Sequence, residues 1–208
     1  MRTLIAAAIL AALPFVASAN EGFSYTYVEG GWNQVQVNDD LLDDPDADGG
    51  YLRGSFAIAD QVFLFAGYSK ASKTYRIDPV RVRFELAQPE FGIGYHQEFT
   101  GRLDFTADLA WLRLNQEANI SGTGDPGLDD RFRDHTTAGR ATMGLRGAPS
   151  PRTELWVKAG YLDGSNLSGS FVGDLGGQVK FNATWGLVGE IEVIEDVTRY
   201  SVGVRASF

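Results

Sequence analysis

The chain of 208 residues contains no cysteine, so an exported protein of this sequence must hold its fold without disulfides. Sheet closure or a large hydrophobic interface has to stabilise it instead. Helical patterns longer than the first apolar stretch are also missing, whereas glycine (25 residues) and aromatic residues (12%) are abundant. Because glycine disfavours helices and aromatic side chains suit sheet surfaces, the composition is typical of an all-β protein.

Basic residues are scarce relative to acidic ones. The chain has 18 Lys and Arg against 27 Asp and Glu, which gives a formal net charge of -9. Nucleic-acid binding needs clustered Lys and Arg to meet the phosphates, so nucleic acid is excluded as a partner.

The N-terminus has the layout of a secretory signal peptide. Met1-Arg2-Thr3 is a charged start, an apolar stretch covers 4–16, and Ala17-Ser18-Ala19 forms an A-x-A cleavage site. We expect residues 1–19 to be removed by cleavage after Ala19 and residues 20–208 to form the mature domain. The alternative is a retained N-terminal helix or anchor, which is disfavoured because the apolar run is too short to span a membrane.

Alternating hydrophobicity divides the remaining chain into ten segments. In one of them, Phe105 and Leu109 share one parity while Asp104 and Asp108 share the other. Successive side chains of a strand point to opposite faces, so each segment predicts a strand with one apolar and one polar face. The segments are 22–37, 50–59, 62–70, 83–99, 102–115, 136–147, 152–163, 169–181, 185–195 and 198–208.

A soluble β-sandwich and a transmembrane barrel both fit this alternation, and the connections decide between them. Short turns at one end and longer loops at the other are typical of a membrane barrel with periplasmic turns and extracellular loops. We therefore predict an all-β fold, a ten-stranded antiparallel transmembrane β-barrel with up-and-down connections. Tight joints occur at 59–61, 100–101, 147–151 and 182–184, and the opposite end has 38–49, 71–82, 116–135, 163–168 and 196–197.

The fourth segment contains Pro89, which cannot donate a hydrogen bond to a strand ladder. We expect either a bulge at this proline or a strand that starts near Glu90.

The last strand ends on Phe208, with Tyr200, Val202 and Val204 on the parity expected to face lipid. This ending resembles the terminal signal that the barrel-assembly machinery reads in Gram-negative outer-membrane proteins. The resemblance implies that this machinery is a partner during insertion and that these four residues are the assembly signal.

Other stretches look like the small outer-membrane barrels of xanthomonads, and the resemblance covers the whole chain. It is carried by ALPF at 12–15, SYTYVEGG at 24–31, DADG at 46–49 and FAGYS at 65–69. It implies an outer-membrane location in a Gram-negative bacterium, surrounded by outer-membrane lipid and lipopolysaccharide. The sequence departs from the family most in 75–90 and 116–135, so ligands of relatives are not carried over to those stretches.

The parity opposite to the lipid face would line the lumen, and it carries charges of both signs. A ten-stranded barrel is narrow, whereas open channels belong to barrels of about sixteen strands. An unpaired charge in a confined site is costly, so we expect these charges to pair as a structural plug. The alternative is a porin-like, narrow pore for ions or small solutes. The predicted network is Arg53, Asp104, Asp108, Arg140, Glu154, Lys158, Asp174, Glu190, Glu192, Arg199 and Arg205.

Two pairings within this network follow from the expected hairpin registers. Lys158 should face Asp174 across one hairpin. In the last hairpin, the carboxylates at 190 and 192 should lie diagonal to the arginines at 205 and 199.

Catalysis needs a base beside a nucleophile or a water, and only two histidines are available. His96 lies toward the predicted periplasmic end, where a hydrogen-bonding role in the lumen fits it better. His135 is at the predicted extracellular rim beside Asp134, but adjacent residues of a strand point to opposite faces. We therefore predict no catalytic residue, and a rim hydrolase of the outer-membrane protease or lipid-modifying kind is a further alternative.

The first long connection contains the opening half of a calcium loop, D-x-D-x-D-G, with carboxylates at Asp44, Asp46 and Asp48. The closing bidentate glutamate is replaced by Ser55. The hypothesis is weak Ca²⁺ binding, or divalent bridging to lipopolysaccharide phosphates, and the alternative is a solvated acidic turn. No other cofactor is predicted.

The longest connection, 117–134, is rich in glycine and polar residues, which is typical of mobile surface segments that recognise partners. The sequence therefore predicts an integral outer-membrane barrel with a structural role or a surface-interaction role through extracellular loops, and it does not identify the loop partner.

Overall fold

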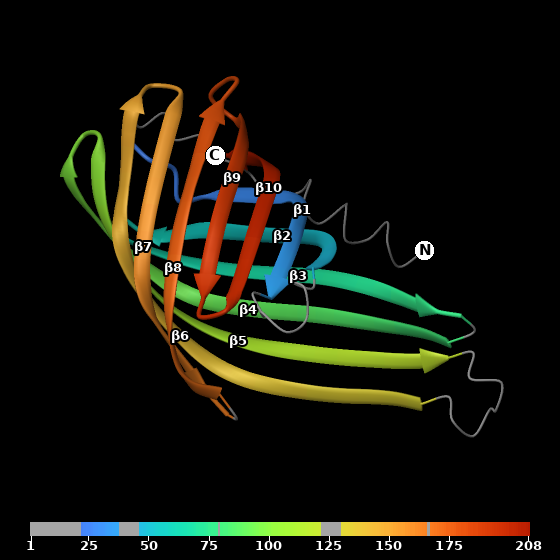
Figure 1. Cartoon of the computed structure of the whole chain (residues 1–208). Coiled ribbons are helices and arrows are strands. Elements are labelled where there is room, and N and C mark those ends of the chain that lie inside the picture. Colours follow the sequence, from blue (N-terminus) through green and yellow to red (C-terminus); the bar gives the residue numbers. More distant parts are fainter. Residues whose placement is uncertain (1–21, 38–45, 79, 122–129, 166) are drawn as a thin grey trace, which may run out of the picture.

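The computed structural model describes residues 22–37, 46–78, 80–121, 130–165 and 167–208, which form one closed antiparallel barrel (Figure 1). Each strand pairs with its sequence neighbours, and β1 pairs with β10 to close the sheet. The prediction of a ten-stranded all-β barrel is confirmed. The strands are β1 (Tyr27–Val37), β2 (Asp46–Ala59), β3 (Val62–Ile77), β4 (Val80–Thr100), β5 (Leu103–Ser121), β6 (Asp130–Ser150), β7 (Thr153–Gly164), β8 (Leu167–Lys180), β9 (Trp185–Ile194) and β10 (Val197–Ser207).

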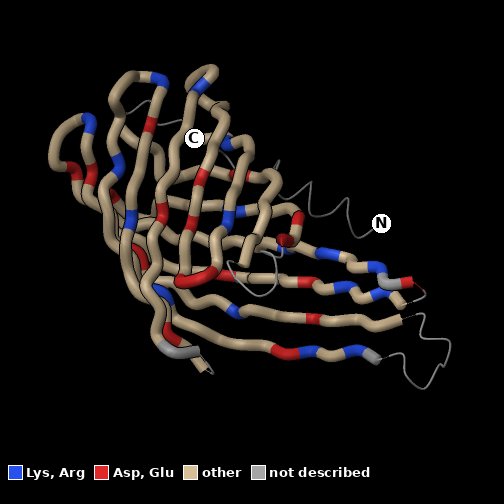
Figure 2. Tube along the Cα trace, in the orientation of Figure 1, with Lys and Arg blue, Asp and Glu red and all other residues tan. Residues whose placement is uncertain are grey.

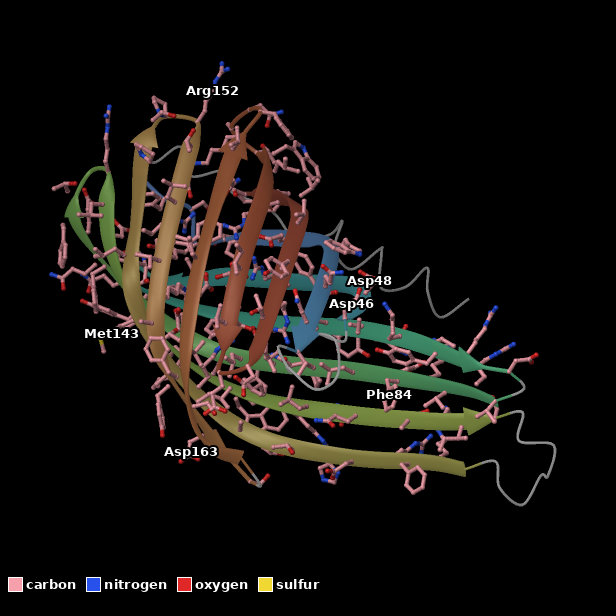
Figure 3. The ribbon with its side chains drawn as sticks, viewed as in Figure 1. Asp46, Asp48, Phe84, Met143, Arg152 and Asp163 are labelled. Carbon is pink, nitrogen blue, oxygen red and sulfur yellow. The ribbon has the colours of Figure 1, made fainter. Side chains whose placement is uncertain are left out.

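The outer face of the barrel is apolar and the inner face is polar, the reverse of a soluble protein. Leu109 is 61% exposed on the outside, whereas its neighbour Asp108 is 8% exposed and points inward. Met143, 62% exposed, points away from the barrel in the same way (Figure 3). This alternation is what a sheet produces when one face meets lipid and the other lines a lumen.

Four turns at one end of the barrel are tight, at 60–61, 101–102, 151–152 and 181–184. At the other end, β3 to β6 run side by side beyond the ends of β1 and β2 (Figure 1). Among the described residues, no helix is long and apolar enough to cross a membrane. The predicted signal peptide at 1–19, with its cleavage site after Ala19, lies outside the described residues.

Two predicted loops are largely strand. The stretch 71–82 continues β3 to Ile77 and starts β4 at Val80, and residues of 116–135 extend β5 to Ser121 and begin β6 at Asp130. Both predictions were too long because these stretches carry charged side chains on the face that is apolar elsewhere. Strand pairing does not require an apolar outer face where no lipid meets it, so the charged strands resembled loops.

The expected bulge or strand start at Pro89 is wrong. Pro89 lies inside β4 and pairs with Tyr68 of β3, while the ladder between β4 and β5 omits Gln88 and Pro89 without a change of register. The missing N–H thus affects only the β5 side of the strand. The irregularity of β4 lies instead between Glu98 and Thr100.

Candidate functional site

The centre of the lumen is a cluster of ion pairs that joins four strands. Arg53 of β2 contacts Glu29 of β1 and Glu190 of β9, each at 2.6 Å between nitrogen and oxygen. The second oxygen of Glu29 accepts a hydrogen bond from Arg205 Nε of β10 at 2.6 Å. Glu29 is 1% exposed, so its charge is compensated by these two arginines and by the Tyr51 hydroxyl, which donates to it at 2.7 Å.

A second cluster lies toward the end from which β3 to β6 project. Glu192 pairs with Arg140 at 2.6 Å and with Arg199 at 3.0 Å. Arg140 also reaches Glu90 at 3.1 Å, and Arg199 donates to Gln88 Oε1 at 2.6 Å. These contacts connect β4, β6, β9 and β10 across the lumen.

The Trp156 side chain links Glu190 of the central cluster to Asp174 of β8. Its indole Nε1 lies 3.2 Å from both Asp174 Oδ1 and Glu190 Oε2. A Cβ added to Gly176 would lie 2.4 Å from the Trp156 ring, so the ring position requires glycine in β8. The ammonium of Lys158 forms an ion pair with Asp108 of β5.

The floor of the lumen lies at the tight-turn end and is aromatic. Tyr25 stacks on His96 with ring centroids 3.8 Å apart, and its hydroxyl donates to Asp104 Oδ2 at 2.8 Å. His96 Nδ1 lies 3.4 Å from the same oxygen without hydrogen-bond geometry, so stacking is its main contact. Arg146 packs against the Tyr25 ring and pairs with Glu154, which also pairs with a lysine of β8.

Toward the other end of the lumen, an apolar cluster lies on the inner wall of the adjacent strands β5 to β8. Leu112, Ala138, Leu162 and Val172 are each at most 3% exposed and pack together. A cavity of about 150 Å³ lies in the lumen among the charged clusters. Among the described residues, the side chain of the buried Asn33 has no hydrogen-bond partner, nor does Asp108 Oδ1. The lumen therefore contains a small polar space that is surrounded by paired charges.

All eleven residues predicted for the lumen lie on inward-facing positions. One of the two predicted pairings matches the register: Lys158 is opposite Asp174 in the ladder, although its ammonium pairs with Asp108. In the last hairpin Glu192 lies directly opposite Arg199, and Glu190 is opposite a serine and pairs with Arg53. The diagonal arrangement predicted for that hairpin is wrong, because β9 and β10 are shifted by two residues relative to the predicted register.

Sequence reasoning missed four charged members of the lumen, Glu29, Glu90, Arg146 and Lys180. Arg146 has the same parity as Arg140 on β6, so the alternation could have identified it. Glu29 is flanked by Gly30 and lies in a strand with weak alternation, and its role depends on contacts with β2 and β10. Glu90 was placed at a strand start, where its orientation was undefined.

The predicted calcium site is only partly described. Asp44 lies outside the described residues, whereas Asp46 and Asp48 are part of β2 instead of a sharp turn (Figure 3). The Asp46 carboxylate forms an ion pair with Lys73 and accepts a hydrogen bond from Gln34 Nε2 at 3.1 Å. No cluster of three or more metal-ligating side chains occurs among the described residues. The weak Ca²⁺ site stays a prediction.

His135, predicted at the extracellular rim, makes no ring contact with its acidic neighbour Asp134. His135 is exposed, and its backbone N–H, not its ring, contacts Asp134 Oδ1 at 2.7 Å. At the C-terminus, Phe208 N–H donates to Thr26 O at 2.9 Å and Phe208 O accepts from Ser24 Oγ at 2.7 Å. The other residues of the predicted assembly signal, Tyr200, Val202 and Val204, are exposed on the outer face.

The ends of β3 to β6 form what we name the projecting sheet, residues 70–77, 80–87, 115–121 and 130–135. Its two edges, Lys73–Ile77 of β3 and Asp130–His135 of β6, have no ladder partner beyond β4 and β5 respectively. One face is apolar, with Tyr75 and Phe84 in edge contact at 6.1 Å between ring centroids. Figure 3 places Phe84 on this outer part of β4.

Charged residues are frequent along the outer parts of β3 to β6 (Figure 2), and ion pairs place several of them on the other face of the projecting sheet. The Glu85 carboxylate forms ion pairs with Lys70 Nζ at 2.7 Å and with Arg83 Nη2 at 2.8 Å. Glu117 pairs with Arg131 and Arg133. The Lys70 hydrogen bond holds the pKa of Glu85 below its usual value. Burial raises the pKa of Glu117, but the two arginines outweigh it and hold that pKa low as well.

Neither protein-family models nor curated proteins match the sequence. Among solved structures, the chain is similar to the attachment invasion locus protein Ail of Yersinia pestis, with 12% identity, 88% of this chain and 97% of that chain covered and a TM-score of 0.47. It is also similar to Neisserial surface protein A (13%, 89% and 98%, TM-score 0.45) and to the KdgM porin (15%, 87% and 99%, TM-score 0.45). At these identities and TM-scores no role is transferred to this chain.

Proposed function

We propose that the chain is an integral β-barrel of a Gram-negative outer membrane that is plugged by its own side chains and acts by surface interaction instead of catalysis. The observation that carries this proposal is the set of ion pairs that cross the lumen above its aromatic floor. Surface interaction is then left to the projecting sheet.

Membrane insertion is supported by the continuous apolar outer face. Phe171, Leu175 and Val179 on β8 are each more than half exposed, although β8 lies within a closed sheet. A water-soluble barrel would expose this apolar surface at a large free-energy cost, whereas hydrocarbon accepts it and a closed barrel leaves no unpaired edge there.

The plug is supported by the pairing of the lumen charges. Removing one partner from a buried pair leaves the other charge uncompensated, which is strongly destabilising. The clusters also cross-link strands that are distant in the barrel, such as β6 and β9 through Arg140 and Glu192. Ion pairs of this kind fill a narrow lumen and fix its cross-section.

A surface-interaction role is supported by the shape of the projecting sheet. Its open edges present unpaired backbone groups, which can take an added strand from a partner. Its apolar face adds side-chain area beside those edges. No residue pattern among the described residues of the projecting sheet identifies this partner.

A narrow pore is the second candidate function. The cavity of about 150 Å³ and the unpartnered polar atoms of Asn33 and Asp108 favour it, because a polar space within the lumen is what ions or small solutes would pass through. No geometry among the described residues favours the rim hydrolase, and we propose no catalytic function.

Two measurements on one sample test the proposal. Protein extracted from outer membranes should migrate differently on a denaturing gel before and after boiling, and the folded sample should stay silent in a planar bilayer. A band that does not shift contradicts the membrane barrel. A shifted band with stable conductance replaces the plug by the pore.

Processing and assembly are part of the same proposal. The xanthomonad resemblance, cleavage after Ala19 and recognition of Tyr200, Val202, Val204 and Phe208 by the barrel-assembly machinery all belong to an exported outer-membrane chain. N-terminal sequencing of the membrane-extracted protein should begin at Asn20. A start at Met1 contradicts the signal peptide.

A further inference from the structure

The charged face of the projecting sheet is strongly cationic, although the chain as a whole has a net charge of -9. Ion pairs place Lys70, Arg83, Arg131 and Arg133 on one face around Glu85 and Glu117. The register adds two more arginines to this face, because residues two apart on a strand share a face. The cationic face thus consists of Lys70, Arg76, Arg81, Arg83, Arg131 and Arg133, with Glu85 and Glu117 as its acidic members.

The carboxylates of this face organise the cations without neutralising them. Each glutamate serves two basic side chains and is 21% exposed, whereas the four paired basic side chains are 49 to 64% exposed. The guanidinium groups and the ammonium therefore keep surface available for a second anion. An arginine fork can bind a phosphate oxygen pair in this way.

Two arginines at the tip have no ion pair of this kind, although the exposed Asp78 lies in the turn between them. Arg76 of β3 lies directly opposite Arg81 of β4 in the ladder, and neither has an ion pair among the described residues. Like charges directly opposite each other in a sheet are destabilising. An anion bound between them removes that repulsion, so this pair is the strongest single indication of an anionic ligand.

The direction of the face indicates where the anion comes from. Glu117 and Arg83 lie on the same parity of β5 and β4 as Trp111 and Phe91, which belong to the exposed apolar outer face. The cationic face therefore continues the lipid-facing surface beyond the apolar belt and looks sideways over the membrane. The apolar face, with Tyr75 and Phe84, continues the lumen side.

The cations also occur at successive heights above the belt. Lys70 is two residues beyond Tyr68, and Arg76 is six residues further along β3. With a rise of about 3.3 Å per residue and a strand tilt of about 45°, these rows cover roughly 15 Å along the membrane normal. A single layer of phospholipid headgroups meets only the lowest row, whereas a lipid with a phosphorylated sugar chain meets several.

We propose that the cationic face binds the phosphates of lipopolysaccharide in the outer leaflet, with Arg76 and Arg81 as its outermost contact. This inference rests on the proposed outer-membrane location. It assigns the projecting sheet two different neighbours, lipopolysaccharide on its cationic face and any protein partner on its apolar face or edges.

The test uses the full mature barrel, folded in detergent, and fluorescent lipopolysaccharide that carries its core sugars and phosphates. The variant is Arg76→Gln/Arg81→Gln. The matched control is Arg102→Gln/Arg152→Gln, which removes two arginines, equally free of ion pairs among the described residues, from the tight turns at the opposite end (Figure 3). Both variants must keep the heat-dependent gel shift, which they should, because neither site contacts the lumen clusters.

The wild type and the control should bind alike, more weakly as salt rises, and the Arg76/Arg81 variant should lose at least about fivefold in affinity, as expected of two exposed charge contacts. Dephosphorylated lipopolysaccharide should show a loss of at least the same size. Adding Arg83→Gln, Arg131→Gln and Arg133→Gln to the variant should deepen the loss.

Three results would overturn the inference: equal binding by the variant, equal binding of the dephosphorylated lipid, or wild-type preference for a soluble sulfated polysaccharide or for phosphatidylglycerol vesicles over lipopolysaccharide. In each of these cases, a retained gel shift would still support the membrane barrel. A wild-type sample that lacks the shift instead contradicts the proposed function, so the two failures are distinguishable.

Discussion

Glu29 shows how one side chain couples three strands. Its two oxygens contact Arg53 of β2 and Arg205 of β10 across the seam that closes the barrel. A Glu29→Gln substitution keeps the size of the side chain and removes its charge, which leaves two buried arginines without their shared partner. We expect a loss of about 3 kcal/mol or more in the free energy of unfolding.

Denaturant unfolding in micelles, followed by the gel shift, measures this loss. Glu85→Gln is the control, because its partners are half exposed and surface pairs contribute at most about 1 kcal/mol. Similar losses in the two variants would contradict a buried, shared role for Glu29.

Glu117 offers a pH-dependent test outside the barrel. Its pKa is lowered by Arg131 and Arg133 despite burial, which raises it. A lowered pKa in the folded state contributes stability above the ordinary carboxyl value of about 4.3, and this contribution is lost as the pH falls through the lowered value. Carboxyl NMR should show Glu117 titrating below that ordinary value.

In an Arg131→Gln/Arg133→Gln variant, the titration of Glu117 should move back up toward the ordinary value. An unchanged midpoint would mean that the two arginines do not hold the carboxylate, and the charged face would lose one of its two organising pairs.

At the residue scale, sequence parity identified which charges point inward but not which charges meet. Lys158 illustrates this, because its ladder partner is Asp174 whereas its ammonium reaches Asp108 two strands away. Contacts across a lumen depend on barrel closure and on side-chain length. Neither quantity is visible in the alternation of a single strand.

At the scale of elements, β8 depends on a glycine beneath an aromatic ring. A Cβ at Gly176 would lie 2.4 Å from the Trp156 indole, so Gly176→Ala should displace the ring and break its contacts with Asp174 and Glu190. We expect a cost of about 1–3 kcal/mol, as in other overpacked sites.

Gly189→Ala on the neighbouring β9 is the matched control, since a Cβ there meets nothing within 4 Å. Near-ultraviolet circular dichroism of the tryptophans and the unfolding midpoint should change only in the Gly176 variant. Equal behaviour of the two alanine variants would show that the Trp156 ring is free to move.

The elements were predictable from sequence where lipid shapes the pattern and less so beyond it. The alternation located all ten strands, and the tight turns were close to their observed positions. The outer parts of β3 to β6 were assigned largely to loops, because residues such as Arg76 and Arg81 occupy positions that are apolar inside the belt. Side chains still alternate between two faces there, but the charged ones lie on the face that is apolar within the membrane.

At the scale of the whole molecule, side chains cross the lumen at two levels. Tyr25 and His96 stack at the tight-turn end, and the ion pair of Arg140 and Glu192 links β6 to β9 nearer the other end. The fold class and the inward charges were predictable from sequence. The apolar cluster of Leu112, Ala138, Leu162 and Val172 was not, because its residues share the inward parity with charged ones and come from four different strands.

Barriers in series make a specific prediction for conductance. Opening one level alone leaves the other closed, so neither Arg140→Gln/Glu192→Gln nor Tyr25→Ala/His96→Ala should conduct stably in a planar bilayer. The four substitutions together should produce steady openings, because the lumen is then open at both levels. The gel shift confirms that each variant is folded before it is measured.

The size of the openings depends on the central cluster of Glu29, Arg53, Glu190 and Arg205, which remains in the fourfold variant. Both signs are present there, so the openings should be small and should rise when Arg53→Gln/Glu190→Gln removes a further pair. If the wild type conducts as well as the fourfold variant, the two levels are not barriers, and the charged clusters line a pore instead of forming a plug.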